Sequence, residues 1–520
     1  MKKTMKWYAV ISLTLALCMM AGAASACTTI YAGSEATLDG TTIFGRSEDF
    51  GNSSNKLMYV SPAGKHTAGE VYNGCYGFTW TFTHDSYSYT AFSDDNGEGV
   101  GGECPDCGQT HEHTPYEAGG TNEMGVTVTA TETIGGAETS EEADPYEDLG
   151  IEEAEIVTVL LGEAATAKEA LTVLTGIYDT AGACDGAGLI VADKDETWYI
   201  ENVTGHQYIA VKLSDDMVMV QPNMAIIGLI DLDDTENVVA SAGLIETAQA
   251  AGTFVGDAEA NVIDYVASYC GETQANARMV NALAYLDPAY SDTEAEIDPA
   301  AYLITNVGEG GEIVAMQTGI HPDHKLSIAE VQDFYHIPNI GYVRNLETHI
   351  FQLDGQEGAT STVEWVTMND AAINVFVPYY PMLTTDVYAP YKLSTVNAEF
   401  TQEEPESGLY YPTTVYQRVN GERVAVEGFM VLPDVWAESM YWTYDALSNM
   451  VMYCGLDEAV VNNVYQTLYD KQAQVNASFE EFKATLASAE DPAQAATQWS
   501  MAAAQDTHET AIGLVNEILK

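Results

Sequence analysis

The hydrophobic pattern near the start of the chain predicts a hairpin. Residues 28–32, Thr-Thr-Ile-Tyr-Ala, are β-branched and aromatic and predict a strand. Asp39-Gly40 is a turn signal, and residues 41–44 predict the returning strand. The start of one antiparallel strand lies beside the end of the next. We therefore expect Cys27 and Arg46 at one end of the pair, with Asp49 a short step further.

The next part of the chain alternates predicted strands and helices. Residues 125–131 predict a strand, residues 151–161 have helical spacing, and Thr166-x-x-Glu169 is a capping box that opens a second helix. Four further short strands are predicted at residues 188–192, 197–201, 207–213 and 217–221. Strands in meander order around a helix pair indicate an antiparallel sheet packed with helices, an α+β layered fold.

Beyond residue 240 the pattern becomes mixed and then helical. Helices are predicted at residues 239–252 and 257–269, and strands at residues 312–317, 364–368 and 372–376. The stretch from about 435 to 520 is strongly helical, with a helix start at Asp491-Pro492-x-Gln494. We expect a catalytic domain over residues 27–430 and a helical C-terminal region over residues 431–520, packed on it.

The N-terminus has the pattern of a signal peptide over residues 1–26. Lys2, Lys3 and Lys6 precede an apolar run, and Ala24-Ser25-Ala26 is a small-x-small cleavage site. Cleavage after Ala26 would make Cys27 the first residue of a secreted or cell-surface protein. No later apolar stretch approaches the ~18 residues of a membrane span.

Cys27 would then carry a thiol and a free α-amine, and the amine can act as base for its own nucleophile. Two other interpretations stay open. A lipoprotein signal also ends before a Cys, and Cys27 could instead be half of a disulfide. Lipoprotein signals usually have Leu or a similar large apolar residue where this chain has Ala24, which favours the ordinary signal peptidase.

The composition of the chain bears on its binding partners, its core and its cysteines. The formal charge is −60, so the surface repels nucleic acid and anionic membrane faces. Hydrophobic residues make up 46% of the chain, enough for a substantial core. The chain has 8 cysteines. Cys18 lies in the signal and Cys27 is the candidate nucleophile, so an even number remains, which permits disulfides in an exported protein.

Four residues are candidates to act with the proposed nucleophile. The Arg46 guanidinium would favour the thiolate of Cys27, and the Asp49 carboxylate could orient the amine. Asn122 lies in a turn just before a strand, and Asn223 lies at a strand end, where an amide could donate to an oxyanion. A surface ion pair for Arg46 and Asp49, and turn chemistry for the asparagines, are the alternatives.

The order and spacing of several motifs closely resemble the C69 dipeptidases, which are N-terminal-nucleophile (Ntn) hydrolases. The similarity is dense from residue 27 to about 223 and thinner to about 470. The motifs are Cys-Thr-Thr-Ile-x-x-Gly (27–33), Asp-Gly-Thr-Thr (39–42), Arg-x-Glu-Asp (46–49), Gly-x-Asn-Glu-x-Gly-Val (120–126), Thr-Glu-Thr-Ile (131–134), Asp-Pro-Tyr (144–146) and Gly-Leu-Ile-Val-Ala-Asp-Lys-Asp-Glu-Thr-Trp-Tyr (188–199).

The resemblance implies a four-layer αββα sandwich and amide hydrolysis that needs no cofactor. Cys27 would be the nucleophile, with Arg46 and Asp49 supporting its thiol and amine. Asn122 and Asn223 would hold the substrate and the oxyanion, and Arg344 is the candidate for a later arginine that the wider group uses. The chain departs from the family pattern at two places. Ser47 replaces a common Asn, and residues 224–227 lack an expected basic residue.

We therefore expect a secreted cysteine dipeptidase acting on dipeptides or small amides. The alternatives are a choloylglycine- or penicillin-type amidase of the same group, and a lipid-anchored binding protein.

One insert lies outside the resemblance. Cys104-Pro-Asp-Cys107 with His111 and His113 offers four ligands that suit tetrahedral zinc. A Cys104–Cys107 disulfide and a loosely ordered polar loop are the alternatives. Any metal here would be structural.

Overall fold

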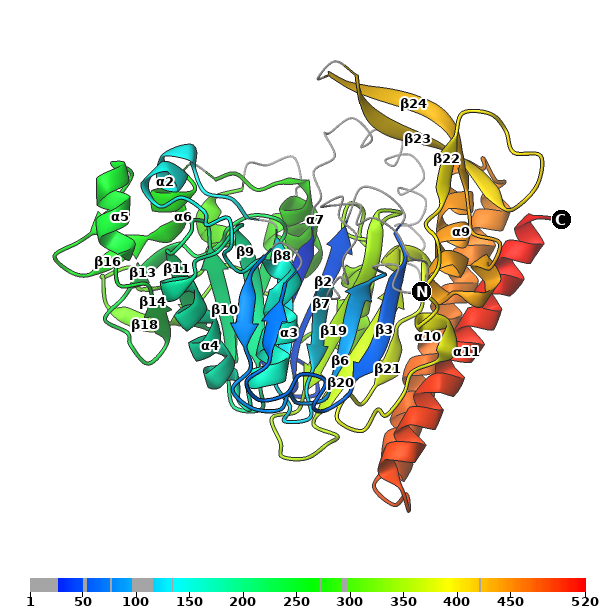
Figure 1. Cartoon of the computed structure of the whole chain (residues 1–520), viewed down its shortest axis with the longest axis horizontal. Coiled ribbons are helices and arrows are strands. Elements are labelled where there is room, and N and C mark those ends of the chain that lie inside the picture. Colours follow the sequence, from blue (N-terminus) through cyan, green and yellow to red (C-terminus); the bar gives the residue numbers. More distant parts are fainter. Residues whose placement is uncertain are drawn as a thin grey trace.

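The protein has a mixed α+β architecture built on two large antiparallel sheets (Figure 1). The structure is a computed structural model that describes residues 27–49, 54–74, 77–95, 116–132, 134–271, 273–291, 297–419 and 422–520. The predicted signal peptide and the insert with Cys104, Cys107, His111 and His113 lie outside the described residues.

The six-stranded sheet has the order β12-β1-β2-β19-β20-β21. Its strands are β1 (Thr28–Ala32), β2 (Thr42–Asp49), β12 (Val218–Gln221), β19 (Asn345–Leu353), β20 (Thr362–Met368) and β21 (Val377–Tyr379). The predicted hairpin is confirmed, because β1 and β2 are antiparallel and Thr29 pairs with Arg46.

The eight-stranded sheet has the order β14-β11-β10-β9-β8-β7-β6-β3. Its strands are β3 (Lys56–Ser61), β6 (Tyr89–Asp94), β7 (Glu117–Thr121), β8 (Thr127–Glu132), β9 (Ala187–Ala192), β10 (Thr197–Asn202), β11 (Tyr208–Lys212) and β14 (Val238–Ala240). The expected meander holds for β9, β10 and β11. It then breaks, because β12 crosses to the other sheet, where Gln221 pairs with Thr29.

Helices α3 (Glu153–Glu163) and α4 (Ala167–Thr180) bury one face of the eight-stranded sheet, with Val128 and Val191 in the same apolar cluster as Leu160. The opposite face packs on the six-stranded sheet, where the rings of Phe92 and Phe351 lie 6.2 Å apart. The burial of these apolar side chains is the main stabilising contribution to this core.

The outer face of the six-stranded sheet contacts the C-terminal helices. The rings of Trp365 in β20 and Phe479 in α10 lie 5.3 Å apart. The neighbouring Glu364 points the other way and accepts a hydrogen bond from Thr90 of β6 at 2.6 Å. This alternation follows from the two-residue period of a strand.

The predicted helical C-terminal part consists of α9 (Met440–Tyr453), α10 (Glu458–Leu486) and α11 (Pro492–Ile518). Asp491 caps α11 as expected, accepting from the N–H of Gln494 at 3.0 Å. Asp445 of α9 accepts from Tyr411 (3.0 Å) and Asn369 (3.1 Å), which attaches these helices to the sheets. No helix among the described residues is long and apolar enough to cross a membrane.

Some local predictions were wrong, and one hairpin was missed. Residues 257–269 form the short strands β15 (Gly256–Asp257) and β16 (Val262–Asp264) before α6 (Tyr265–Tyr269), because the Asp264 side chain caps a helix that starts only there. Residues 372–376 are not a strand, since a 3-10 turn occupies Ala371–Ile373. The hairpin of β23 (Tyr410–Val419) and β24 (Glu422–Val431) was not predicted.

The remaining elements are smaller. They are α2 (Glu138–Ala143), α5 (Leu244–Ala251), α7 (Ala277–Leu286), α8 (Ile328–Phe334), β4 (Val71–Asn73), β5 (Thr79–Thr81), β13 (Leu229–Asp231), β17 (Thr305–Val307), β18 (Ile313–Gln317), β22 (Glu399–Thr401), and 3-10 turns at Pro288–Tyr290, Pro299–Ala301, Ala389–Tyr391 and Trp436–Glu438.

Candidate active site

Cys27 lies buried at one end of the six-stranded sheet, directly before β1. Thr29 pairs with both Arg46 and Gln221, so the end of β2 and the residues after β12 lie at this same end. Asp49 pairs with the first residue of β19 there. Sheet register alone therefore gathers Cys27, Asp49 and Asn223 at one place, although they are distant in sequence.

The surroundings of Cys27 keep its thiol protonated. Burial raises the pKa of Cys27 to about 12, the Arg46 guanidinium opposes this, and the carboxylates of Glu153, Asp49 and Glu48 add to it. A thiol with such a pKa reacts only if a base takes its proton as it attacks. In the uncleaved chain the nitrogen of Cys27 is a peptide amide and has no basic lone pair.

Arg46 is fully buried and only partly paired. Its Nη1 donates to Glu153 Oε1 at 2.8 Å, and Nη2 lies 3.8 Å from carboxylate oxygens of Glu48 and Glu347. Nε and Nη2 make no hydrogen bond to any residue that the structure describes. Buried donors without acceptors are costly. The guanidinium thus keeps donor capacity for an anion formed next to it.

Asp49 is held by a residue that the sequence analysis missed. Arg278, on α7, forms an ion pair with it, with Nη1 2.6 Å from Asp49 Oδ2. Asn345 donates to the other carboxylate oxygen of Asp49. Arg278 also donates to Thr28 Oγ1 at 3.1 Å and to the Tyr342 hydroxyl at 2.8 Å. It therefore joins α7 to β1, which follows Cys27, and to the end of β2.

The scarcity of arginine in this chain is the feature of the sequence that could have indicated a role for Arg278. The chain contains five arginines, at positions 46, 278, 344, 418 and 423. Arg344 is half-buried in the turn before β19, and its charge acts on Asp49 and Tyr342. The first three arginines thus lie at this sheet end, and Arg278 makes the direct contact with Asp49.

The two predicted asparagines differ. Asn122 is buried, its Nδ2 donates to the carbonyls of Leu161 (2.9 Å) and Ala164 (2.7 Å), and its Oδ1 accepts from the N–H groups of Met124 and Val126 at 3.0 Å each. These bonds occupy both donors and both lone pairs of the amide. Asn122 therefore ties a turn to α3, and we leave it out of the catalytic set proposed below.

Asn223 lies at the same sheet end as Cys27. It lies two residues after Gln221, as Cys27 lies two residues before the paired Thr29. It is half-buried, and its backbone has a φ of 62°, in the left-handed region. Asn tolerates this region better than most residues.

A buried charge network continues from Arg46 into the space between the sheets. Lys56 lies 2.6 Å from Glu48 and also contacts Asp94. Burial raises the pKa of Glu48 to about 7, against the opposing effect of Lys56. These contacts pair the buried charges, as burial requires.

One further cluster of side chains consists of residue types that can bind a metal ion. Glu152, Cys184 and Asp185 have ligand atoms within 4.8 Å of one another. Cys184 Sγ donates to Glu152 at 3.4 Å, which accounts for their proximity.

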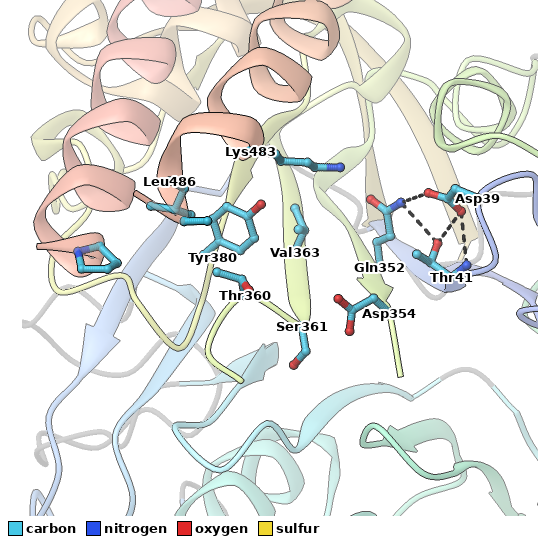
Figure 2. Close-up of a pocket in the computed structure, with 12 residues that line it drawn as sticks. Asp39, Thr41, Gln352, Asp354, Thr360, Ser361, Val363, Tyr380, Lys483 and Leu486 are labelled. Atoms are coloured by element: carbon cyan, nitrogen blue, oxygen red, sulfur yellow. Dashed lines mark hydrogen bonds between the residues drawn. The ribbon is translucent and has the colours of Figure 1, made fainter. Parts of the chain in front are cut away.

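Two cavities lie away from Cys27. Figure 2 shows one of about 360 Å³, where Asp39 and Thr41 bond to Gln352 on one side and Lys483 and Leu486 of α10 lie on the other. A second, of about 450 Å³, includes Tyr31. Both are at the opposite end of the β1–β2 hairpin from Cys27, so neither is the candidate active site.

The comparison with known proteins agrees with the motifs. The model of peptidase family C69 matches residues 26–404, and the chain belongs to this family.

Two of the curated relatives that the chain matches are named as probable dipeptidases. A "Probable dipeptidase B" of Streptococcus pyogenes serotype M18 is 32% identical over 231 residues, which cover 44% of each chain. The match thus spans less than half the length of that relative. A "Probable dipeptidase" of Salmonella dublin is 28% identical over 397 residues, covering 72% of this chain and 85% of the relative. A solved structure of penicillin V acylase from Agrobacterium tumefaciens aligns with a TM-score of 0.30 and 13% identity, covering 68% of this chain and 85% of that one.

Proposed function

We propose that this protein is an exported cysteine dipeptidase in which Cys27, exposed by cleavage after Ala26, is the N-terminal nucleophile. Membership of peptidase family C69 and the names of the curated relatives support peptide hydrolysis. The observation that carries the proposal is the position of Cys27, buried at a sheet end beside Arg46 and Asp49. We interpret the facing sheets, with helices on both outer sides, as the αββα sandwich of the Ntn hydrolases.

The chemistry follows from the groups around the nucleophile. The free amine of Cys27 takes the thiol proton, and the sulfur attacks the peptide carbonyl. Arg46 stabilises negative charge at the sulfur. The Asn223 amide and a backbone N–H stabilise the tetrahedral oxyanion. The amine then protonates the leaving amino group and activates the water that hydrolyses the thioester. Asp49, held by Arg278, orients the amine.

The test compares substrates and a matched cysteine variant. Purified mature protein should hydrolyse dipeptides in preference to conjugated bile salts and penicillin V. Cys27→Ala should abolish turnover with the fold intact, and Cys27→Ser should keep at most a trace. Cys454→Ala, which removes a half-buried cysteine at the end of α9, should be as active as the parent.

Other outcomes would decide for the alternatives. Turnover of bile salts or penicillin V without dipeptide hydrolysis would indicate an amidase of the same group. A mature N-terminus with the mass of diacylglyceryl-cysteine, and no hydrolysis, would indicate a lipid-anchored binding protein. Dipeptide hydrolysis by the Cys27→Ala variant at the parent rate would refute the mechanism.

A further inference from the structure

The turn after β12 needs external support to hold Asn223 in place. Asn223 has a positive φ of 62°, a backbone conformation that L-residues adopt at some cost. Its neighbour Pro222 has no N–H to donate. Hydrogen bonds from other elements contribute to holding this turn.

One side chain bonds both to this turn and to the helix that carries Arg278. Asn276 is the N-cap of α7, and its Oδ1 accepts from the N–H groups of Arg278 and Met279 at 3.0 Å each. Its Nδ2 donates to the carbonyl oxygen of Pro222 at 2.6 Å. The same amide therefore spans the two segments that bear Arg278 and Asn223.

The far end of the turn is anchored separately. The buried carboxylate of Glu201, on β10, accepts from the N–H groups of Ile226 (2.7 Å) and Ile227 (3.3 Å). Gln221 Nε2 donates to the carbonyl of Met224 at 3.3 Å. The stretch on either side of Asn223 is thus held at both ends, and Asn276 bonds to the carbonyl of the residue directly before it.

The bond to Pro222 controls the orientation of Asn223 directly. The carbonyl of Pro222 and the N–H of Asn223 belong to one planar peptide group. A hydrogen bond to this oxygen therefore fixes the plane of the peptide group between Pro222 and Asn223. Because the peptide is trans, the N–H of Asn223 then points in the direction opposite to the oxygen. A displacement of about 1 Å in a positioned group can cost about 100-fold in rate.

We propose that Asn276 is a positioning residue that fixes the Asn223 turn relative to the Arg278 helix. This rests on the proposed function, in which Asn223 stabilises the oxyanion. Asn276 does not touch the reacting atoms. It acts through Asn223, and its loss is expected to lower kcat more than it changes KM.

Two variants separate this role from helix capping. Asn276→Ser and Asn276→Asp both keep an N-cap acceptor for α7, but neither retains the amide donor to Pro222. We expect kcat for a dipeptide to fall about 10-fold or more, with KM and the melting temperature nearly unchanged. In an Asn223→Ala background, Asn276→Ser should cause no further loss. Thr166→Ala removes the cap of α4, on the outer face of the other sheet, and should lower the melting temperature without lowering kcat.

Amide hydrogen exchange tests the placement without any substrate. Exchange of the peptide over residues 222–227 should rise in Asn276→Ser and stay at the parent rate in Thr166→Ala. Unchanged exchange, a kcat equal to the parent, or a kcat loss that adds fully to that of Asn223→Ala would each overturn the inference. Absence of dipeptide hydrolysis in the parent would instead refute the proposed function, and the exchange result would still decide the placement.

Discussion

Replacing Arg278 with Met should destabilise the protein more than most single substitutions do. The change removes the ion pair to Asp49, whose side chain is buried, and the hydrogen bonds to Thr28 and Tyr342. Burial already raises the pKa of Asp49, and Arg278 is the strongest opposing influence. Breaking a buried pair by removing one partner costs about 3–5 kcal/mol. We expect a loss of this size in the free energy of unfolding at pH 7.

A second substitution identifies the origin of this loss of stability. In Asp49→Asn/Arg278→Met no buried charge is left unpaired, so most of the lost stability should return. Dipeptide hydrolysis should remain lost in both variants, because Asp49 can no longer orient the amine. Arg344→Met is the matched control, since Arg344 is half-buried and opposes the raised pKa of Asp49 less than Arg278 does, so its stability should fall by less than that of Arg278→Met.

Urea denaturation followed by tryptophan fluorescence, with hydrolysis measured on the same samples, would test this account. An Arg278→Met protein as stable as the parent would refute the reasoning. So would a double variant no more stable than Arg278→Met, because the cost would then not arise from the uncompensated carboxylate.

Three further predictions concern other parts of the molecule. Asn122→Ala should lower stability by about 2 kcal/mol or more, because buried partners lose their hydrogen bonds, while kcat per folded molecule stays near the parent value; a stable variant with reduced kcat would contradict this. Burial raises the pKa of Glu364 to about 8, so the folded state binds a proton that the unfolded chain releases, and stability should fall as pH rises from about 5 to 8. Glu364→Gln should weaken this fall in melting temperature, and an identical pH profile would show that another group is responsible. The Cys104→Ser/Cys107→Ser protein should keep dipeptide hydrolysis, and any bound zinc, about one equivalent per chain, should be lost; reversible inhibition of the folded parent by a chelator would show instead that a metal is catalytic.

The sequence alone predicted the elements that depend on residues close together in the chain. The β1–β2 hairpin depends on a β-branched run and an Asp-Gly turn, both close in sequence, so the hairpin and the approach of Arg46 to Cys27 could be predicted, whereas the pairing register comes from the structure. The N-caps at Thr166 and Asp491 depend on residues three apart and were also correct. The Glu169 side chain, however, accepts from the N–H of Ala165, so the second bond of the predicted capping box differs.

Tertiary contacts limited the prediction of the site. Arg278 bonds to Thr28 across 250 residues, and no local pattern encodes which helix packs on that sheet end. The motif around Asn122 correctly predicted a turn before a strand. Its side chain, however, reaches carbonyls of α3, which only the folded chain brings near. The strand 217–221 was predicted as part of the meander, but it leaves the sheet of β9–β11 and pairs with β1 in the six-stranded sheet.

In the proposed mechanism the α-amine of Cys27 is the catalytic base. Two proteins test it most directly, one beginning at Cys27 and one retaining Ala26 in front of it, with both N-termini verified by mass. We predict that the first hydrolyses dipeptides and that the second is at least about 100-fold slower, because its nitrogen is an amide and general-base assistance is lost. Equal activity of the two verified proteins would contradict the account.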